Sequence, residues 1–272
     1  MPKASLTLLL ACALAANCFA QGKPLKIFGT VRIDSATLME ETEVSLKEWM
    51  GFIVNNNFDE SLYPDSTCIA SSTKLVFNDL RRKKDFQYLK VTKNWLKYFG
   101  DKEVETAKDF NKLAETDPNY FSLKLPVTGI TYEQAQKFCK WKEDVINQNQ
   151  KDKITVSLPS IEIYKKVITN IDTLSKNCKC LVLNCSTARD KTGGKDKQSA
   201  TQGKGLESVI SYFPTSLGLY GLQGNAAEMT STFGIAMGGS FRQTARESYN
   251  DRSQKYNKAE GWLGFRYIII TK

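Results

Sequence analysis

The most informative absence in this 272-residue sequence is histidine, which does not occur at all. Without an imidazole there is no Ser-His-Asp or Cys-His catalytic arrangement, no histidine-ligated zinc, copper or iron, and no histidine general base. Any chemistry must therefore use cysteine, carboxylates, lysine, tyrosine or backbone groups.

The overall composition is that of an ordinary globular protein, with 41% hydrophobic and 25% charged residues. This length allows one large domain or two small ones with a sizeable core. The 38 basic and 29 acidic side chains give a net charge of +9. These charges are dispersed and the chain carries an export signal, so we do not expect nucleic-acid binding.

The first 20 residues are typical of a signal peptide. Lys3 precedes an apolar stretch over residues 4–16, and small residues lead to a predicted cleavage site after Ala20. We favour this site over a lipoprotein anchored at Cys18, because Asn17 is a poor residue directly before a lipid-bearing cysteine. No other stretch is apolar enough to cross a bilayer. The expected protein is exported, periplasmic or extracellular, with no transmembrane segment in the mature chain.

Five cysteines follow the predicted signal peptide: Cys68, Cys139, Cys178, Cys180 and Cys185. Export permits disulfides, but an odd number leaves at least one thiol free or paired elsewhere. The last three lack a fourth ligand for tetrahedral zinc. We therefore favour one or two disulfides in a surface loop, and the pairing stays open.

Three helix starts are marked by capping residues. Ser45 and Thr131 each begin a capping box, and Ser160 is a predicted N-cap. Cys139 lies beside the buried stripe of the second helix, which favours a packed small hydrophobe over a nucleophile. A short hairpin is expected within residues 25–38 and a strand over residues 263–271.

Residues 21–272 are predicted to form a single domain with a lysine-rich, irregular insertion at about residues 55–119. A basic run lies at residues 81–84 of this insertion. We favour a solvated helix end for this run over a patch that binds an anionic surface.

Buried roles are expected near the C-terminus. Asn225 and Glu228 could tie neighbouring loops by hydrogen bonds, and Arg266 could form a buried bidentate pair with a carboxylate such as Glu228. These are scaffold roles that require no chemistry.

A series of short motifs, in order and spacing, resembles the formylglycine-generating enzyme or sulfatase-modifying-factor family. The matching segments are residues 43–45, 125–130, 138–141, 158–160, 218–228, 238–241 and 264–266. The resemblance implies an α+β fold related to C-type lectins, which is irregular and loop-rich with a few helices and short antiparallel sheets.

The resemblance also implies where catalytic residues would stand. The family's oxidases place two copper-binding cysteines two and seven residues after the aromatic of a Gly-Gly-Ser-aromatic motif. Counted from Phe241, these positions hold Gln243 and Ser248. An amide and a hydroxyl do not suit Cu(I), which selects soft sulfur ligands. The related iron-dependent branch needs histidines, so we expect no catalytic residues and no redox cofactor.

The calcium sites that the resemblance implies are eroded in this sequence. The resemblance implies ligands at Gly224, Ala226 and Glu228, with a side-chain oxygen at a position that Gly221 occupies, and a second site beginning at Asn184. Calcium needs six to eight oxygens, with carboxylates supplying most of the charge.

The favoured function is therefore an exported, non-catalytic family member that acts in binding or assembly in the cell envelope. Residues 120–141, followed by an Asn/Gln/Lys-rich stretch, are similar to gliding-motility and type IX secretion proteins, which implies a protein partner in the secretion machinery.

Two alternatives stay open. One is binding of a glycan or small anionic ligand in the former active-site groove, lined by Arg242, Gln243, Arg246, Ser248 and Tyr249. The other is a different enzyme activity, using Glu247 and Asp251 as paired carboxylates.

Overall fold

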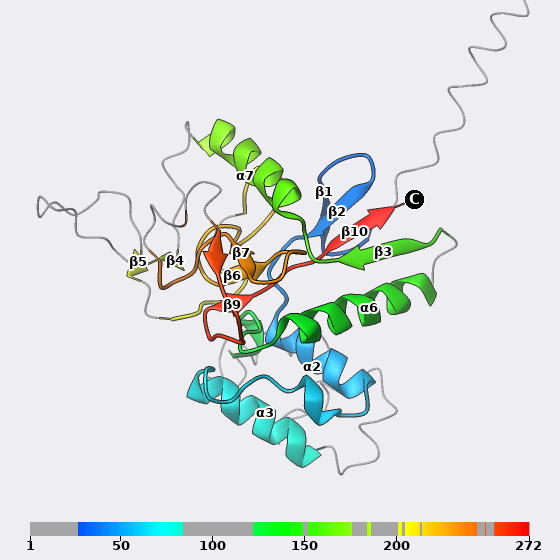
Figure 1. Cartoon of the computed structure of the whole chain (residues 1–272), viewed down its shortest axis with the longest axis vertical. Helices are drawn as coiled ribbons and strands as arrows, with labels where there is room; N and C mark the ends of the chain where they lie inside the picture. The colour runs from blue at the N-terminus through cyan, green and yellow to red at the C-terminus, as the bar shows by residue number, and fades with distance from the viewer. Residues whose placement is uncertain are drawn as a thin grey trace, which may run out of the picture.

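The computed structural model describes most of the chain beyond the predicted signal peptide (Figure 1). The described residues are 27–83, 122–148, 152–175, 184–185, 201–202, 205–212, 214–243, 248 and 253–271.

The first sheet joins the two ends of the domain. Its strands lie in the order β1 (Thr30–Arg32), β2 (Thr37–Glu40), β10 (Ile268–Thr271) and β3 (Ile154–Ser157), all antiparallel. The expected N-terminal hairpin is present as β1 and β2. The last strand, β10, lies between the hairpin and β3, so the C-terminus completes the sheet.

The second sheet consists of strands of two or three residues. It has the order β8 (Gln254–Lys255), β7 (Ile235–Met237), β6 (Ala227–Met229) and β9 (Leu263–Gly264), and β9 runs parallel to β6. The single strand predicted over residues 263–271 is therefore wrong in one respect. It is two strands, β9 and β10, which belong to different sheets and are separated by residues 265–267.

A third pairing is small. β4 (Asn184–Cys185) runs parallel to β5 (Thr201–Gln202). Together with the two larger sheets and the helices, it gives the mixed, loop-rich α+β fold that the sequence predicted.

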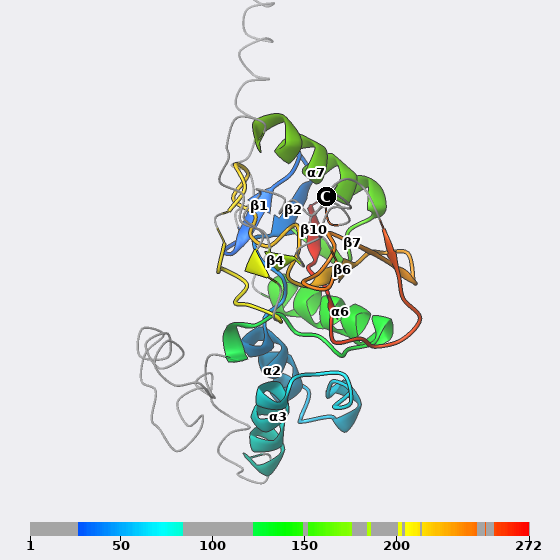
Figure 2. The same ribbon diagram turned by 90° about the vertical axis from the view of Figure 1, so that its left-hand side faces the viewer.

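Two helices cover opposite faces of the first sheet. Figures 1 and 2 show α7 (Ile161–Ser175) on one side and α6 (Tyr132–Gln148) on the other. Side chains alternate accordingly along β2: Leu38 belongs to the core under α6, and Met39 packs with the residues of α7. This is the two-residue period expected of a strand buried on both faces.

The predicted caps are present at the helix starts. Ser160 Oγ accepts from the backbone N–H of Ile163 at 3.2 Å. Thr131 and Gln134 form a reciprocal box, with distances of 3.2 and 2.8 Å between side-chain oxygen and backbone nitrogen. These contacts satisfy amides that a helix start otherwise leaves unpaired.

The cap of α2 (Leu46–Asn55) is only half of the predicted box. Ser45 Oγ accepts from the N–H of Glu48 at 3.3 Å. The Glu48 carboxylate does not reach back, because it pairs with Lys142 on α6.

A helix that the sequence did not predict lies inside the lysine-rich segment. α3 spans Ser71–Lys83, and its Val76, Phe77 and Leu80 are buried in the main core. The guanidinium of Arg81 lies 4.0 Å from the ring centroid of Tyr63. The start of this segment is thus packed structure, and residues 81–83 of the basic run are the last residues of α3. Residues 84–121 lie outside the described residues.

Aromatic rings connect α2 and α6 to the C-terminal segment. Trp49 is stacked on Phe138, with ring centroids 5.6 Å apart, and Phe138 meets Phe265 edge-on at 5.3 Å. All three side chains are fully buried. Such pairs add to the free energy of apolar burial, so this cluster fixes residue 265 and, next to it, residue 266.

The outer edge of β3 is closed by side chains of α6. Asn147 exchanges two hydrogen bonds with the backbone of Ile154, and Glu143 accepts from the N–H of Val156 at 3.0 Å. Closing the edge in this way prevents pairing with another chain. Among the described helices, none combines the length and apolarity that crossing a bilayer requires.

Candidate functional site

A fully buried ion pair lies where the two sheets meet. Arg266, between β9 and β10, donates from Nε to both carboxylate oxygens of Glu228 on β6 at 2.9 and 2.8 Å, and from Nη2 to Oε1 at 2.7 Å. Both side chains have no exposed surface. This confirms the bidentate pair that the sequence suggested.

The remaining donors of Arg266 bind backbone carbonyls. Nη1 reaches the carbonyl oxygens of Glu40 and Glu41 at 3.2 Å, and Nη2 reaches that of Tyr220 at 2.7 Å. Burial lowers the pKa of Arg266, but the charge of Glu228 outweighs this and raises it above its ordinary value. Burial raises the pKa of Glu228, because it disfavours the charged carboxylate, and the positive charge of Arg266 opposes this shift.

A second buried carboxyl lies beside this pair. Glu43 Oε1 accepts from Asn225 Nδ2 at 3.0 Å and from the N–H of Ala226 at 3.4 Å. Glu43 Oε2 has no hydrogen-bond partner among the described residues. Burial, reinforced by the charge of Glu228, raises the pKa of Glu43 to about 8.

Asn225 ties loops together, as predicted. It adopts a left-handed backbone (φ 59°), a conformation that asparagine tolerates better than most residues. Its Oδ1 accepts from the N–H of Glu207 at 2.9 Å, and its Nδ2 also donates to the Glu207 carbonyl at 3.2 Å. One side chain thus joins three segments.

These contacts test the calcium expectation at Gly224, Ala226 and Glu228. Both oxygens of Glu228 already accept from Arg266. A Cβ on Gly221 would come within 2.7 Å of Glu43 Oε2, so that carboxyl fills the space of the missing side chain. This donor set does not fit a calcium ion, which needs several free carboxylate oxygens. Of Asn184, only the backbone in β4 is described.

The two positions that the family resemblance assigns to thiols make local contacts within the fold. Gln243 Oε1 accepts from the backbone N–H of Ser240 at 2.9 Å and from the Ser240 hydroxyl. Ser248 is 4% exposed, and its Oγ has no partner among the described residues.

Ser248 lies directly against Gly239, which has φ +70°. A Cβ at position 239 would be 2.7 Å from Ser248 Cα, so only glycine fits. An amide oxygen bound to its own loop and a buried hydroxyl do not fit Cu(I), whose preferred ligands are thiolates.

The proposed ligand groove is described only in part. Arg242 is exposed, with its guanidinium 5.6 Å from the ring centroid of Phe241. Arg246 and Tyr249 lie outside the described residues, as do Glu247 and Asp251. The groove therefore stays a prediction, because the structure describes only three of its five residues.

Two of the five cysteines are described with their side chains, and both are free thiols, Cys68 and Cys139. Burial raises the pKa of Cys139 to about 12, so its thiol stays protonated and unreactive, as predicted for a packed residue. Cys178 and Cys180 lie outside the described residues, and only the backbone of Cys185 is described.

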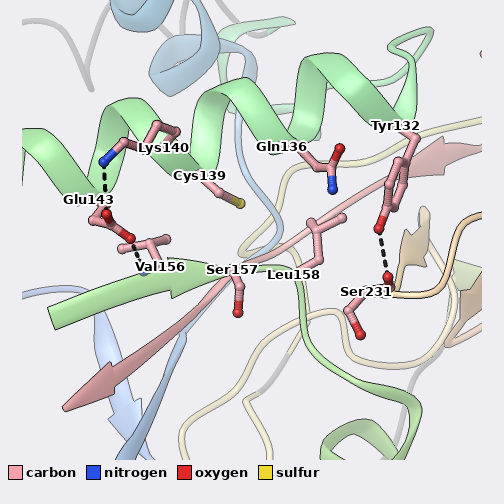
Figure 3. A pocket seen from close by; sticks show the side chains of 9 residues that line it. All are labelled: Tyr132, Gln136, Cys139, Lys140, Glu143, Val156, Ser157, Leu158 and Ser231. Carbon is pink, nitrogen blue, oxygen red and sulfur yellow. Dashed lines mark hydrogen bonds and ion pairs between the residues drawn. The ribbon is translucent and has the colours of Figure 1, made fainter. Parts of the chain in front are cut away.

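A pocket of about 250 Å³ lies between α6 and β3 (Figure 3). Cys139 points into it from the helix, while Lys140 pairs with Glu143 at 2.9 Å. Tyr132 donates to the Ser231 carbonyl at 2.6 Å at the other end. With its lysine paired and its thiol protonated, this pocket offers no activated nucleophile. The sequence predicted the helix that carries one wall of this pocket but no strand at Ile154–Ser157, so the pocket itself was not predicted.

Metal-binding groups are also dispersed. Within the part of the chain that the structure describes, no three His, Cys, Asp or Glu side chains gather as a metal site would need.

Residues 26–270 match the family model of the sulfatase-modifying factor enzyme 1-like domain. The chain belongs to this family. No curated protein matches it.

Several solved structures resemble the chain. CarF is 16% identical over 87% of each chain, with a TM-score of 0.50. Treponema denticola variable protein 1 is 16% identical over 85% of this chain and 84% of its own, with a TM-score of 0.44. PvdO from Pseudomonas aeruginosa is 12% identical over 54% of this chain, with a TM-score of 0.40, and the match spans 63% of PvdO. At these identities, the likeness to CarF shows the fold alone.

The raised pKa of Glu43 makes stability depend on pH. The folded state keeps a proton that the unfolded chain loses above its ordinary pKa of 4.5. The free energy of unfolding should therefore fall as pH rises from about 4.5 to about 8. Glu43→Gln removes this ionisable group and should raise the free energy of unfolding at pH 9 by about 1–3 kcal/mol relative to the parent protein.

Urea unfolding of both proteins at pH 5 and pH 9 measures this difference. Parallel pH profiles for the parent protein and Glu43→Gln would show that Glu43 is not the group responsible. Glu40 is also buried, and its pKa is likewise raised to about 8 by burial. The titration of Glu40 therefore contributes equally to the pH profiles of the parent protein and Glu43→Gln, and the difference between the two profiles reports Glu43.

Proposed function

We propose that the chain is a non-catalytic member of the sulfatase-modifying-factor family that acts as a binding or assembly component of the cell envelope. The observation that carries the proposal is the pair Gln243 and Ser248. The first holds its own loop through Ser240, and the second is buried against Gly239. Neither side chain can supply the thiolate on which the family's oxidase chemistry depends.

The scaffold around these positions is complete without thiols. Gly238 and Gly239 follow β7, and Gly224 donates from its N–H to the carbonyl of Gly238 at 2.9 Å. Phe241 donates from its N–H to the carbonyl of Asn225 at 2.9 Å. The loop before Gln243 is thus fixed by the same residues that surround the Arg266–Glu228 pair, which supports a role for the fold as a rigid binding surface.

The envelope location rests on the predicted signal peptide with cleavage after Ala20. A net charge of +9 also suits a protein among anionic envelope polymers. The further link to gliding motility or type IX secretion rests on the sequence similarity of residues 120–141, of which 122–141 are described and include the start of α6.

A second candidate is recognition of a glycan or small anionic ligand near the former thiol positions. Its support is the exposed guanidinium of Arg242 next to the Ser240–Gln243 contact. Guanidinium groups bind carboxylates and phosphates by paired hydrogen bonds.

Purified protein loaded with Cu(I) should not oxidise a cysteine-containing peptide, because both sulfur ligands are missing. Mass spectrometry of the peptide measures turnover, and competition with a chromogenic chelator measures Cu(I) binding. The matched control is the double variant Gln243→Cys/Ser248→Cys, which we expect to bind Cu(I) at least about tenfold more tightly. Copper-dependent aldehyde formation by the parent protein would contradict the proposal.

The assembly role predicts a stable protein partner in the envelope. Crosslinking of a tagged chain in cells, followed by mass spectrometry, should recover one or a few envelope proteins above the level seen with an unrelated tagged exported protein. Recovery of gliding-motility or type IX secretion components would support the narrower assignment. A chain that crosslinks to nothing beyond the control sample would contradict a role in assembly.

A further inference from the structure

A larger pocket of about 440 Å³ lies at the start of α6, away from Gln243 and Ser248. Three stretches that are distant in sequence form it together with Phe233 in the turn between β6 and β7. These stretches are residues 63–65, 129–134 and 256–259. Its volume is within the range of small-ligand sites. Tyr132 also lines the smaller pocket between α6 and β3, so the two pockets adjoin at this residue.

One wall of this pocket is aromatic and held in place. The Phe233 ring is 57% exposed and meets Tyr132 and Tyr256 edge-on, with centroids 5.5 and 5.9 Å away. Tyr132 is fixed by its hydrogen bond to the Ser231 carbonyl, and Tyr256 by a backbone bond to Gly234. A large apolar ring kept at the surface by two neighbours offers a flat face to a ligand.

The rim of the pocket is polar and carries charges of both signs. Asp65, Glu133, Asn257 and Lys258 are all exposed lining residues. Asp65 Oδ1 accepts from the N–H and hydroxyl of Thr67 at 2.8 and 2.7 Å, and these bonds lower the pKa of Asp65. Its carboxylate is therefore ionised, fixed in orientation and able to accept further hydrogen bonds.

Two lining residues have unsatisfied hydroxyls. The Oη atoms of Tyr63 and Tyr256 are buried and have no hydrogen-bond partner among the described residues. A buried hydroxyl without a partner costs about 1–3 kcal/mol. These two unpaired groups add hydrogen-bonding capacity beside the pocket, which suits a ligand that bears hydroxyl groups better than an apolar one.

We propose that this pocket binds a sugar ring. The apolar C–H face of the ring lies on Phe233, and its hydroxyls donate to the carboxylates of Asp65 and Glu133. Asn257 and Lys258 donate to ring or hydroxyl oxygens at the rim. An anionic ligand fits less well, because two carboxylates face a single lysine that also lies 3.9 Å from Glu260. The proposal is independent of the non-catalytic assignment and of the former thiol positions.

Saturation-transfer NMR and calorimetry on the full chain test the proposal, with glucose, galactose, mannose and N-acetylglucosamine as probes. At least one sugar should bind, and Phe233→Ala should weaken its affinity at least about tenfold. The matched control is Ile210→Ala, which truncates a side chain that is 55% exposed and does not line the pocket. This control should bind as the parent protein does.

A second variant keeps the test valid if Phe233→Ala fails to fold. Glu133→Gln changes one exposed rim atom on the first turn of α6 and should also reduce sugar affinity. Binding of none of the four sugars would overturn the proposal. Equal sugar affinities for Phe233→Ala, Glu133→Gln and Ile210→Ala would also overturn it. Choline, an organic cation, serves as a further probe, and binding of choline but of no sugar would overturn the proposal as well. None of these outcomes alters the expected copper or crosslinking results.

Discussion

The buried pair of Arg266 and Glu228 is the interaction on which the arrangement of the two sheets depends. Arg266 stands in the short segment between β9 and β10, where the chain leaves one sheet and enters the other. Its guanidinium holds Glu228 of β6 and the two carbonyls at the end of β2, those of Glu40 and Glu41. A buried charge pair is tolerated only when both partners are fully hydrogen-bonded. This pair meets that condition, and so it fixes the relative positions of the segments that it joins.

The same region explains how the fold stands without thiols at positions 243 and 248. Asn225 and Glu43 tie the segments beside the ion pair, and Gly239, which lacks a Cβ, leaves the space that Ser248 occupies. None of these contacts uses a sulfur atom. The contacts that hold this part of the fold therefore do not depend on residues at positions 243 and 248 supplying sulfur.

The sequence predicted those parts of the structure that depend on local signals or on strong chemical pairing. The caps at Thr131 and Ser160 follow from side chains next to the amides they satisfy. A buried arginine needs a carboxylate, and Glu228 is one candidate partner that the sequence offers for Arg266. Helix α3 was not predicted, because Val76, Phe77 and Leu80 stand in a lysine-rich stretch in which their helical spacing is hard to recognise. The pocket at Phe233 could not be predicted, since its lining comes from segments that only the tertiary fold brings together.

A double-mutant cycle on Arg266 and Glu228 tests the central claim most directly. Arg266→Met and Glu228→Gln should each lower the free energy of unfolding by about 3–5 kcal/mol, because each leaves a buried charge without its partner. The double variant should cost clearly less than the sum of the two, giving a coupling of about 2 kcal/mol or more. Two small and additive losses would show that the pair does not hold the sheets together.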